Sequence, residues 1–259
     1  MNDYETFDIE VRGDGVGLVT IDRPTKRNAM SVAFFRELPR VLDELDANAD
    51  VRAVVITGSG DEAFSAGGDI ASFAEMHSID AYRRRLRVVY DAFHAVERAE
   101  VPVVAAVNGI AYGGGTELTL ACDLALASDQ ARFAFREPTV GLMPGYGVIR
   151  GPGVIGPVWT RYLALTADAI DAETAERIGL VLRAVPHDRL LEEAVDLAAR
   201  IARQAPLATR LGKQFINRRQ MAPGQPESIE ATSLLFATQD HAEGVQAFLE
   251  KREPRFEGR

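Results

Sequence analysis

Short runs of aliphatic residues recur along the first two thirds of the chain, with segments of helical spacing between them. The runs at residues 16–21, 54–57, 103–107 and 124–127 are apolar at nearly every position. Such runs are typical of strands that are covered on both faces, as in α/β proteins. We therefore expect an α/β core.

A helix is predicted directly after Ser31, because serine is a favoured N-cap residue. Its buried face should be formed by apolar residues at helical spacing, namely Phe35, Leu38, Leu42 and Leu45. Pro39 lies inside this pattern and should kink the helix, since proline lacks an N–H and crowds the preceding turn.

The pattern changes after about residue 186, where strand-like runs stop. From residue 191 the apolar positions keep helical spacing, and prolines divide the remainder into about three helices. We predict two regions, a core over residues 1–190 that holds the functional site and a helical C-terminal domain over residues 191–259.

Composition excludes several classes of function. The chain has 259 residues, 47% of them hydrophobic, and a formal net charge of -9, which argues against binding to nucleic acid or to an anionic membrane surface. No apolar stretch approaches the roughly 20 residues of a membrane span, and the acidic N-terminus lacks a signal-peptide pattern. We expect a cytoplasmic protein.

Metal and disulfide chemistry have no sequence support. Cys122 is the single cysteine, so no intrachain disulfide can form, and it lies in an apolar run where a packing role is expected. The four histidines are far apart and none belongs to an H-E-x-x-H pair, so no metal site is predicted.

Two small-residue loops follow predicted strands. Gly113-Gly114-Gly115 leads into a helical segment, and a helix start of this kind offers unpaired N–H groups to a partial negative charge. The loop at residues 64–69 also follows a strand, where ligands of α/β proteins usually lie. The structural alternatives are a turn that needs positive φ for the glycines, and a helix cap for Asp69.

Two glutamates adjoin such turns. Glu117 has small or apolar neighbours, and burial there would disfavour the charged form of its carboxyl group. Glu137 follows an alternating strand at residues 132–135. The structural alternative for Glu117 is a favourable charge at a helix start, and that for Glu137 is an ion pair with Arg136 or another base on a solvated rim. Two backbone donors and two carboxyl groups together favour an enzyme that handles a thioester.

A competing dinucleotide-binding pattern is weaker. Residues 151–156 fit G-x-G-x-x-G, but they follow no long first strand, and Pro152 removes an N–H from the turn that would hold pyrophosphate. No nucleophile elbow or Walker loop is present in the sequence.

Several motifs in order resemble the enoyl-CoA hydratase/isomerase, or crotonase, superfamily. They are D-R-P-T-K-R-N-A-M at residues 22–30, F-S-A-G-G-D at 64–69, the stretch at 107–118, and G-V-Q-A-F-L-E-K-R at 244–252. The resemblance implies a spiral of repeated β-β-α units and a helical C-terminal domain that forms homotrimers, often paired as homohexamers.

The resemblance also implies site residues. The N–H groups of Ala66 and Gly114 would form an oxyanion hole for the thioester carbonyl. Lys26 and Arg27 lie in a segment used near the CoA phosphates, with Lys251 and Arg252 as possible helpers. The expected substrate-binding set is Lys26, Arg27, Ala29, Ala66, Gly67, Gly68, Asp69, Ile70, Gly113, Gly114 and Tyr146. Coenzyme A would be part of the substrate, and no separate cofactor is expected.

Both glutamates of the hydratases are matched, which favours addition of water to a 2-enoyl-CoA, with Glu117 and Glu137 as the catalytic pair. The alternatives are another acyl-CoA reaction of this superfamily, as isomerase, lyase or thioester hydrolase, and a non-catalytic acyl-CoA-binding protein. Arg136 and Tyr146 depart from the usual family pattern, so we expect a reshaped acyl pocket.

Overall fold

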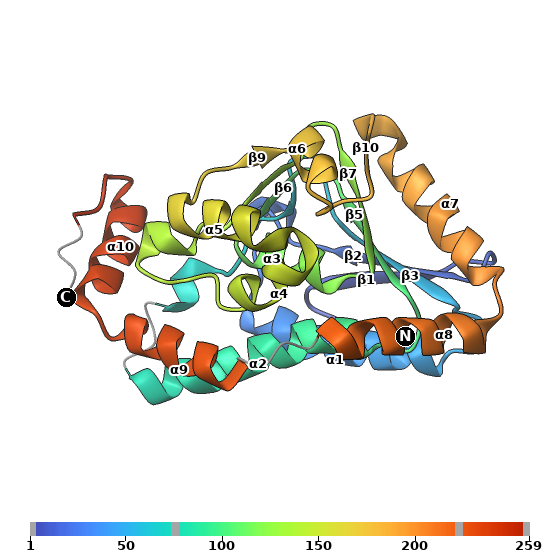
Figure 1. Cartoon of the computed structure of the whole chain (residues 1–259), viewed down its shortest axis with the longest axis horizontal. Coiled ribbons are helices and arrows are strands. Elements are labelled where there is room, and N and C mark those ends of the chain that lie inside the picture. The colour runs from blue at the N-terminus through green and yellow to red at the C-terminus, as the bar shows by residue number, and fades with distance from the viewer. Residues whose placement is uncertain (1–3, 74–77, 221–224, 256–259) are drawn as a thin grey trace.

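A computed structural model describes residues 4–73, 78–220 and 225–255. Its core contains a six-stranded sheet with the order β1-β2-β3-β5-β7-β10 (Figure 1). All neighbours pair in parallel except β1 and β2. The strands are β1 (Phe7–Val11), β2 (Val16–Ile21), β3 (Ala53–Gly58), β5 (Val103–Val107), β7 (Leu124–Ser128) and β10 (Arg183–Val185).

A smaller sheet has the order β4-β6-β8-β9. Its strands are β4 (Ala63–Ser65), β6 (Ile110–Tyr112), β8 (Arg132–Ala134) and β9 (Ile170–Asp171). Each of β3, β5 and β7 is followed by a short strand of the second sheet, and equivalent strands of successive units pair in parallel. The chain therefore winds as a spiral, as expected for the fold class.

Helices enclose both faces of the larger sheet. The main core packs the sheet against α1 (Val32–Ala47), α2 (Ile79–Arg98) and α3 (Gly114–Ala121). A second apolar cluster lies on the opposite face, where α7 (Leu190–Ala202) places Ala194, Ala198 and other small side chains over β3 and β5. Helices on both faces explain why β3 and β5 are buried at every position and consist mostly of apolar residues.

The remaining helices follow the strands of the smaller sheet along the chain or form its C-terminal part. They are α4 (Gly147–Val154), α5 (Gly156–Thr166), α6 (Ala172–Arg177), α8 (Pro206–Gln220), α9 (Gln225–Phe236) and α10 (Gln239–Glu250). Helix α9 packs on α2, and α10 packs on the 3-10 turn η3 (Glu137–Val140). Helix α7 follows the predicted boundary near residue 190 but packs on the larger sheet of the core. The division into two domains stays a prediction.

The predicted start of α1 is confirmed, since the Ser31 hydroxyl accepts a hydrogen bond from the Phe34 N–H at 3.2 Å. The helix continues through Pro39 to residue 47, so the proline does not interrupt it. Its predicted inner residues, Phe35, Leu38, Leu42 and Leu45, are all buried. Among the described residues, no helix has both the length and the apolar character to cross a membrane.

Candidate active site

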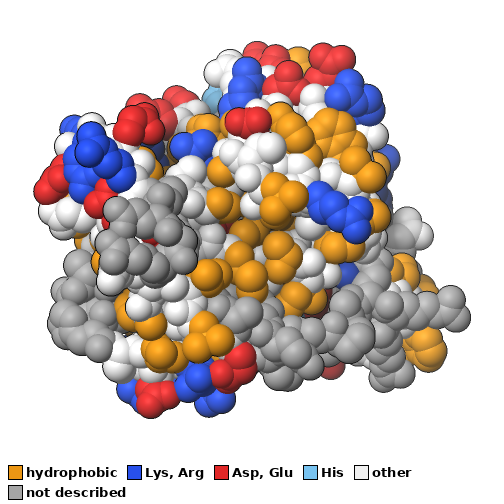
Figure 2. All heavy atoms as spheres, turned by 60° about the vertical axis from the view of Figure 1, so that its left-hand side comes forward, with side chains coloured by type: hydrophobic (Ala, Val, Ile, Leu, Met, Phe, Trp, Pro, Cys, Tyr) orange, Lys and Arg blue, Asp and Glu red, His pale blue; other side chains and the backbone are white. Residues whose placement is uncertain are grey.

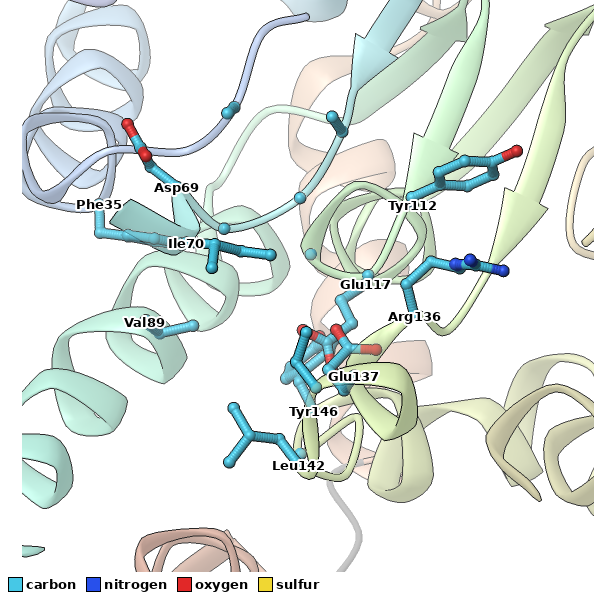
Figure 3. A pocket seen from close by; sticks show the side chains of 18 of the residues that line it. Phe35, Asp69, Ile70, Val89, Tyr112, Glu117, Arg136, Glu137, Leu142 and Tyr146 are labelled. Carbon is cyan, nitrogen blue, oxygen red and sulfur yellow. The ribbon is translucent and has the colours of Figure 1, made fainter. Parts of the chain in front are cut away.

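A cavity of about 660 Å³ lies where the loops after β2, β4, β6 and β8 meet α2 and α10. Figure 3 shows Glu117 and Glu137 side by side, with Phe35, Ile70 and Val89 across from them. The residues of the predicted catalytic and substrate-binding sets all line this cavity: Lys26, Arg27, Ala29, Ala66, Gly67, Gly68, Asp69, Ile70, Gly113, Gly114, Glu117, Glu137 and Tyr146. The structure thus brings together segments that are far apart in the sequence.

The glycines of the 113–115 loop are required by close contacts. Gly113 has φ +49°, and a Cβ atom there would lie 2.6 Å from Glu137 Oε1. A Cβ atom on Gly115 would lie 2.4 Å from the Ser65 carbonyl oxygen. Both approaches exclude a side chain, so the loop can bring the start of α3 beside the 64–69 loop and the Glu137 carboxyl.

The 64–69 loop is braced by the preceding R-N-A-M segment. The buried Asn28 side chain donates to the Ala63 carbonyl oxygen at 2.7 Å, and the Ser65 hydroxyl donates to the Asn28 carbonyl oxygen at 2.8 Å. The Met30 N–H then donates to Gly67 O at 2.8 Å. These bonds fix the loop, which explains why two motifs separated by over thirty residues act together.

The Ala66 N–H is not available as an oxyanion donor, which corrects the prediction for this residue. It donates to the Arg27 carbonyl oxygen at 2.9 Å. By contrast, no hydrogen bond among the described residues uses the N–H of Gly68 or of Gly114, the first residue of α3. A Cβ atom built on Gly114 lies 3.8 Å from Gly68 N, so these two amides are neighbours at the cavity.

Glu117 is buried in the first turn of α3, with 6% of its surface exposed. Its Oε1 accepts the Gly147 N–H at 2.8 Å. Burial raises the pKa of Glu117 to about 7, and the N–H groups of Gly147 and Tyr146 oppose that rise. Glu117 can therefore gain or lose a proton near neutral pH, as a general base must.

Glu137 is the first residue of η3 and lies at the cavity, and its buried Oε2 has no hydrogen-bond partner among the described residues. Burial, together with the nearby Glu117, raises the pKa of Glu137 well above its ordinary value. The expected alternative, an ion pair with Arg136, does not form. Arg136 instead donates to the Ala167 carbonyl oxygen at 3.0 Å and lies 5.8 Å from the Tyr112 ring.

The two carboxyl groups therefore hold one proton between them over a range of neutral pH, because a second buried negative charge is strongly disfavoured. The negative charge of an ionised Glu117 raises the pKa of Glu137 further, which favours the protonated form of Glu137. The pair thus offers one base and one acid in the same cavity.

Glu117→Gln should stabilise the protein at alkaline pH. Because the folded-state pKa is about 7 against an ordinary 4.5, the folded protein binds the extra proton in this interval and its stability falls as pH rises through it. The glutamine keeps an acceptor for Gly147 but cannot ionise. Urea unfolding should show a gain of roughly 3 kcal/mol at pH 8 and almost none at pH 4. The exposed Glu10→Gln serves as the control, and equal stability of Glu117→Gln and wild type at pH 8 would refute the prediction.

The basic residues expected near CoA phosphates divide into two groups. Lys26 and Arg27 are exposed on the cavity rim, and Arg27 pairs with Glu62 at 3.3 Å. Arg252 is instead engaged by Glu243, through Nη1 at 2.6 Å and Nη2 at 2.8 Å, at the end of α10. Arg252 therefore holds the end of α10, and the predicted phosphate role fits Lys26 and Arg27 better.

Sequence reasoning missed the apolar wall of the cavity. Helix α2 contributes Tyr82, Leu86, Val89, Tyr90 and Phe93, and α10 contributes Phe248 and Leu249. The only signal for the α2 residues was helical spacing, which indicates burial without telling a core from a cavity wall. Residues 151–156 of the rejected dinucleotide pattern lie in α4 and at the start of α5, with no strand leading into them.

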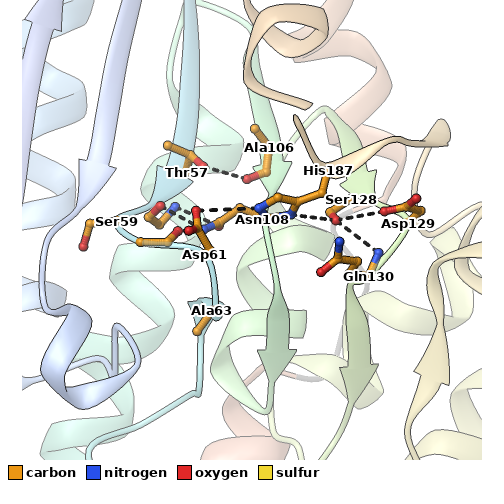
Figure 4. Close-up of polar contacts among 12 residues, drawn as sticks. Thr57, Ser59, Asp61, Ala63, Ala106, Asn108, Ser128, Asp129, Gln130 and His187 are labelled. Atoms are coloured by element: carbon orange, nitrogen blue, oxygen red, sulfur yellow. Dashed lines mark hydrogen bonds and ion pairs between the residues drawn. The ribbon is translucent and has the colours of Figure 1, made fainter. Parts of the chain in front are cut away.

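A second polar cluster superficially resembles a hydrolase triad (Figure 4). His187 Nδ1 lies 3.0 Å from Ser128 Oγ, and His187 Nε2 lies 3.6 Å from Asp61. However, Ser128 is fully buried and its hydroxyl accepts the Gln130 N–H at 3.1 Å. A substrate cannot reach that hydroxyl, so the cluster has a structural role and connects three segments of the chain. No group of three or more potential metal ligands occurs within the described part of the chain.

The enoyl-CoA hydratase/isomerase family model matches residues 12–259, and the chain belongs to this family. A probable enoyl-CoA hydratase of Rhizobium meliloti is 39% identical over 260 residues, which span 99% of each chain. A crotonyl-CoA hydratase of Syntrophomonas wolfei is 38% identical over 98% of each chain. A crystal structure of an enoyl-CoA hydratase/isomerase from Xanthobacter autotrophicus matches with a TM-score of 0.88 and 28% identity, covering 99% of this chain and 100% of that one. The crotonase-like fold is thereby confirmed.

Proposed function

We propose that this protein is an enoyl-CoA hydratase, which adds water across the double bond of a 2-enoyl-CoA thioester to give a 3-hydroxyacyl-CoA. The observation that carries the proposal is the pair of buried carboxyl groups, one with a pKa near neutral and one with a pKa raised well above its ordinary value. They lie beside two backbone N–H groups that no hydrogen bond among the described residues uses. The two relatives described above are named as hydratases and match this chain over nearly their whole length, which supports the same reaction.

In the proposed reaction, the Gly68 and Gly114 N–H groups hold the thioester carbonyl oxygen, where negative charge develops. The Glu117 carboxylate takes a proton from water as the water oxygen bonds to the β-carbon. The electron pair of the double bond moves onto the carbonyl oxygen to form an enolate. Glu137 then protonates the α-carbon as the enolate collapses. The proton gained by Glu117 replaces the one lost by Glu137, so the pair again holds one proton.

The thioester enolate is the only unstable species in this scheme, and the two amides stabilise it. No metal or redox cofactor enters the proposed reaction, and coenzyme A arrives as part of the substrate. Lys26 and Arg27 at the cavity rim are placed to meet its phosphates. The cytoplasmic location inferred from the sequence stays a prediction.

The proposal is tested by mixing the purified protein with short- and medium-chain 2-enoyl-CoA and following the loss of absorbance of the conjugated double bond. Hydration should appear with one or more of these substrates, and mass spectrometry should show a product heavier by one water. A shift of the double bond without added water would indicate an isomerase. Release of free CoA would indicate a thioester hydrolase, and binding without turnover would indicate an acyl-CoA-binding protein.

We further propose that the chain forms homotrimers, which could pair as homohexamers. Exposed apolar side chains support this idea: Leu165 is 79% exposed, Leu207 73% and Val158 71%. Figure 2 shows hydrophobic side chains gathered over one face, between groups of charged side chains. An apolar surface of this kind favours contact with another chain.

A further inference from the structure

A buried ion pair lies behind Glu117, outside the cavity residues that the proposed reaction uses. Arg150 Nε on α4 lies 3.0 Å from Glu97 Oε1 on α2, and the two side chains are only 8% and 9% exposed. Arg150 Nε also contacts the Leu120 carbonyl oxygen in the last turn of α3 at 3.4 Å. Arg150 therefore links three helices at one point.

The same helix α4 presents the backbone donor of the site. Gly147 is its first residue, and the Gly147 N–H meets Glu117 Oε1 at 2.8 Å. Arg150 lies three residues later, so it is on the adjoining turn of the same face. A helix of eight residues with Pro152 inside it has few internal bonds to fix its position, so its attachment to α2 and α3 must come largely from side chains.

The backbone at Gly147 is tightly packed against its neighbours. A Cβ atom there would lie 2.6 Å from the Phe135 ring. Tyr146, just before it, packs its ring 5.0 Å from that of Phe93 on α2. The start of α4 is thus confined by the aromatic side chains and anchored by the ion pair behind them.

We propose that Arg150 and Glu97 are positioning residues: their ion pair locks α4 against α2 and α3, and so aims the Gly147 N–H at the Glu117 carboxylate. The inference deepens the proposed hydratase function and rests on it for its catalytic meaning. The lock matters because an N–H donor stabilises the ionised carboxylate, which is the form that takes the proton from water.

Other charged or titratable groups lie near Glu117 and are left unchanged by the variants below. Glu137 on η3 carries the shared proton, and Tyr82 on α2 faces the two carboxyl groups. His94 on α2 lies 3.8 Å from Glu97, and burial lowers its pKa. Tyr90 and Tyr146 also lie in this neighbourhood and stay unchanged, whereas Glu97 and Arg150 are the residues that the variants replace.

The primary test is titration of Glu117 by infrared spectroscopy, with its carboxyl band assigned by difference from Glu117→Gln. Arg150→Met should move the titration midpoint of Glu117 upward by about one pH unit, because a misaimed N–H stabilises the carboxylate less. The acid limb of the kcat/KM profile should move by the same amount, and kcat at pH 7 should fall about tenfold with a smaller change in KM.

Two further variants separate the effect on the direction of the Gly147 N–H from an effect on overall stability. Arg150→Met/Glu97→Leu removes both charges together, so stability should largely return while the titration midpoint stays shifted. Lys213→Met breaks another buried ion pair, the 2.8 Å contact with Asp123 that anchors α8, and should lower the melting temperature without moving the midpoint.

The positioning role is overturned if Glu117 titrates in Arg150→Met as it does in wild type, or if Lys213→Met shifts it equally. Because the infrared titration needs no turnover, it decides this point even if the wild-type protein hydrates no enoyl-CoA. If the wild-type protein hydrates no enoyl-CoA, the proposed function is refuted, while the infrared titration still tests the positioning role of the ion pair.

Discussion

Glu137→Gln is expected to lower kcat for hydration by about 10³-fold, and Glu117→Gln by a similar factor. General acid or base catalysis commonly contributes about 10² to 10⁴ in rate, and each substitution removes one of these roles while keeping the size of the side chain. Both glutamines should leave KM within a few-fold of wild type, since the cavity wall is unchanged. Steady-state kinetics with a 2-enoyl-CoA measure both constants.

The pattern of the two losses separates the reactions of the family. A joint collapse supports hydration, in which water must be activated and the α-carbon protonated. Retained turnover of some acyl-CoA in Glu117→Gln, with none in Glu137→Gln, would instead point to isomerase-like proton transfer through Glu137 alone. As a control, the exposed Glu62→Gln at the rim should keep kcat.

Gly114→Pro is expected to lower kcat by about 10² to 10³, because loss of one oxyanion donor typically costs about 3 kcal/mol. Gly114 is the first residue of α3, a position where proline fits a helix, so the substitution removes the free N–H and adds the ring carbons without breaking a helical hydrogen bond. Gly114→Ala is the matched variant, since it adds a Cβ but keeps the N–H. That Cβ would lie 3.0 Å from Met30 Sδ, the flexible end of a side chain that can adjust.

Hydration kinetics of the two variants, with circular dichroism as a check on folding, give the result. Gly114→Ala should keep at least about a tenth of wild-type activity, well above Gly114→Pro. If the two folded variants have equal activity, the amide at position 114 is not an oxyanion donor. Gly114 would then be needed only for close packing.

Local chemistry explains what could be predicted from the sequence. Aliphatic runs at residues 16–21 and 103–107 became β2 and β5, because these strands are buried on both faces. Ser31 caps α1 through its own hydroxyl, a contact that spans only three residues. Glu117 and Gly114 were found because a glycine turn followed by a helix is itself a local pattern.

The errors concern contacts between distant segments. Whether Ala66 or Gly68 offers a free N–H depends on the Arg27 carbonyl oxygen, almost forty residues away, which accepts the Ala66 N–H. The direction of Arg136 depends in the same way on Ala167 and Tyr112. Spacing within a segment carries no information about such partners, so the donor was assigned two residues too early in the loop.

The central claim is that the Gly68 and Gly114 amides converge on one carbonyl oxygen with both glutamates at the adjoining carbons. A crystal structure with a bound saturated acyl-CoA, which cannot be hydrated, tests it most directly. The thioester oxygen should lie about 2.7 to 3.1 Å from both nitrogens, with the Glu117 carboxyl group facing the β-carbon and the Glu137 carboxyl group facing the α-carbon. An oxygen out of reach of either amide, or one held by Ala66 in place of Gly68, would contradict the account.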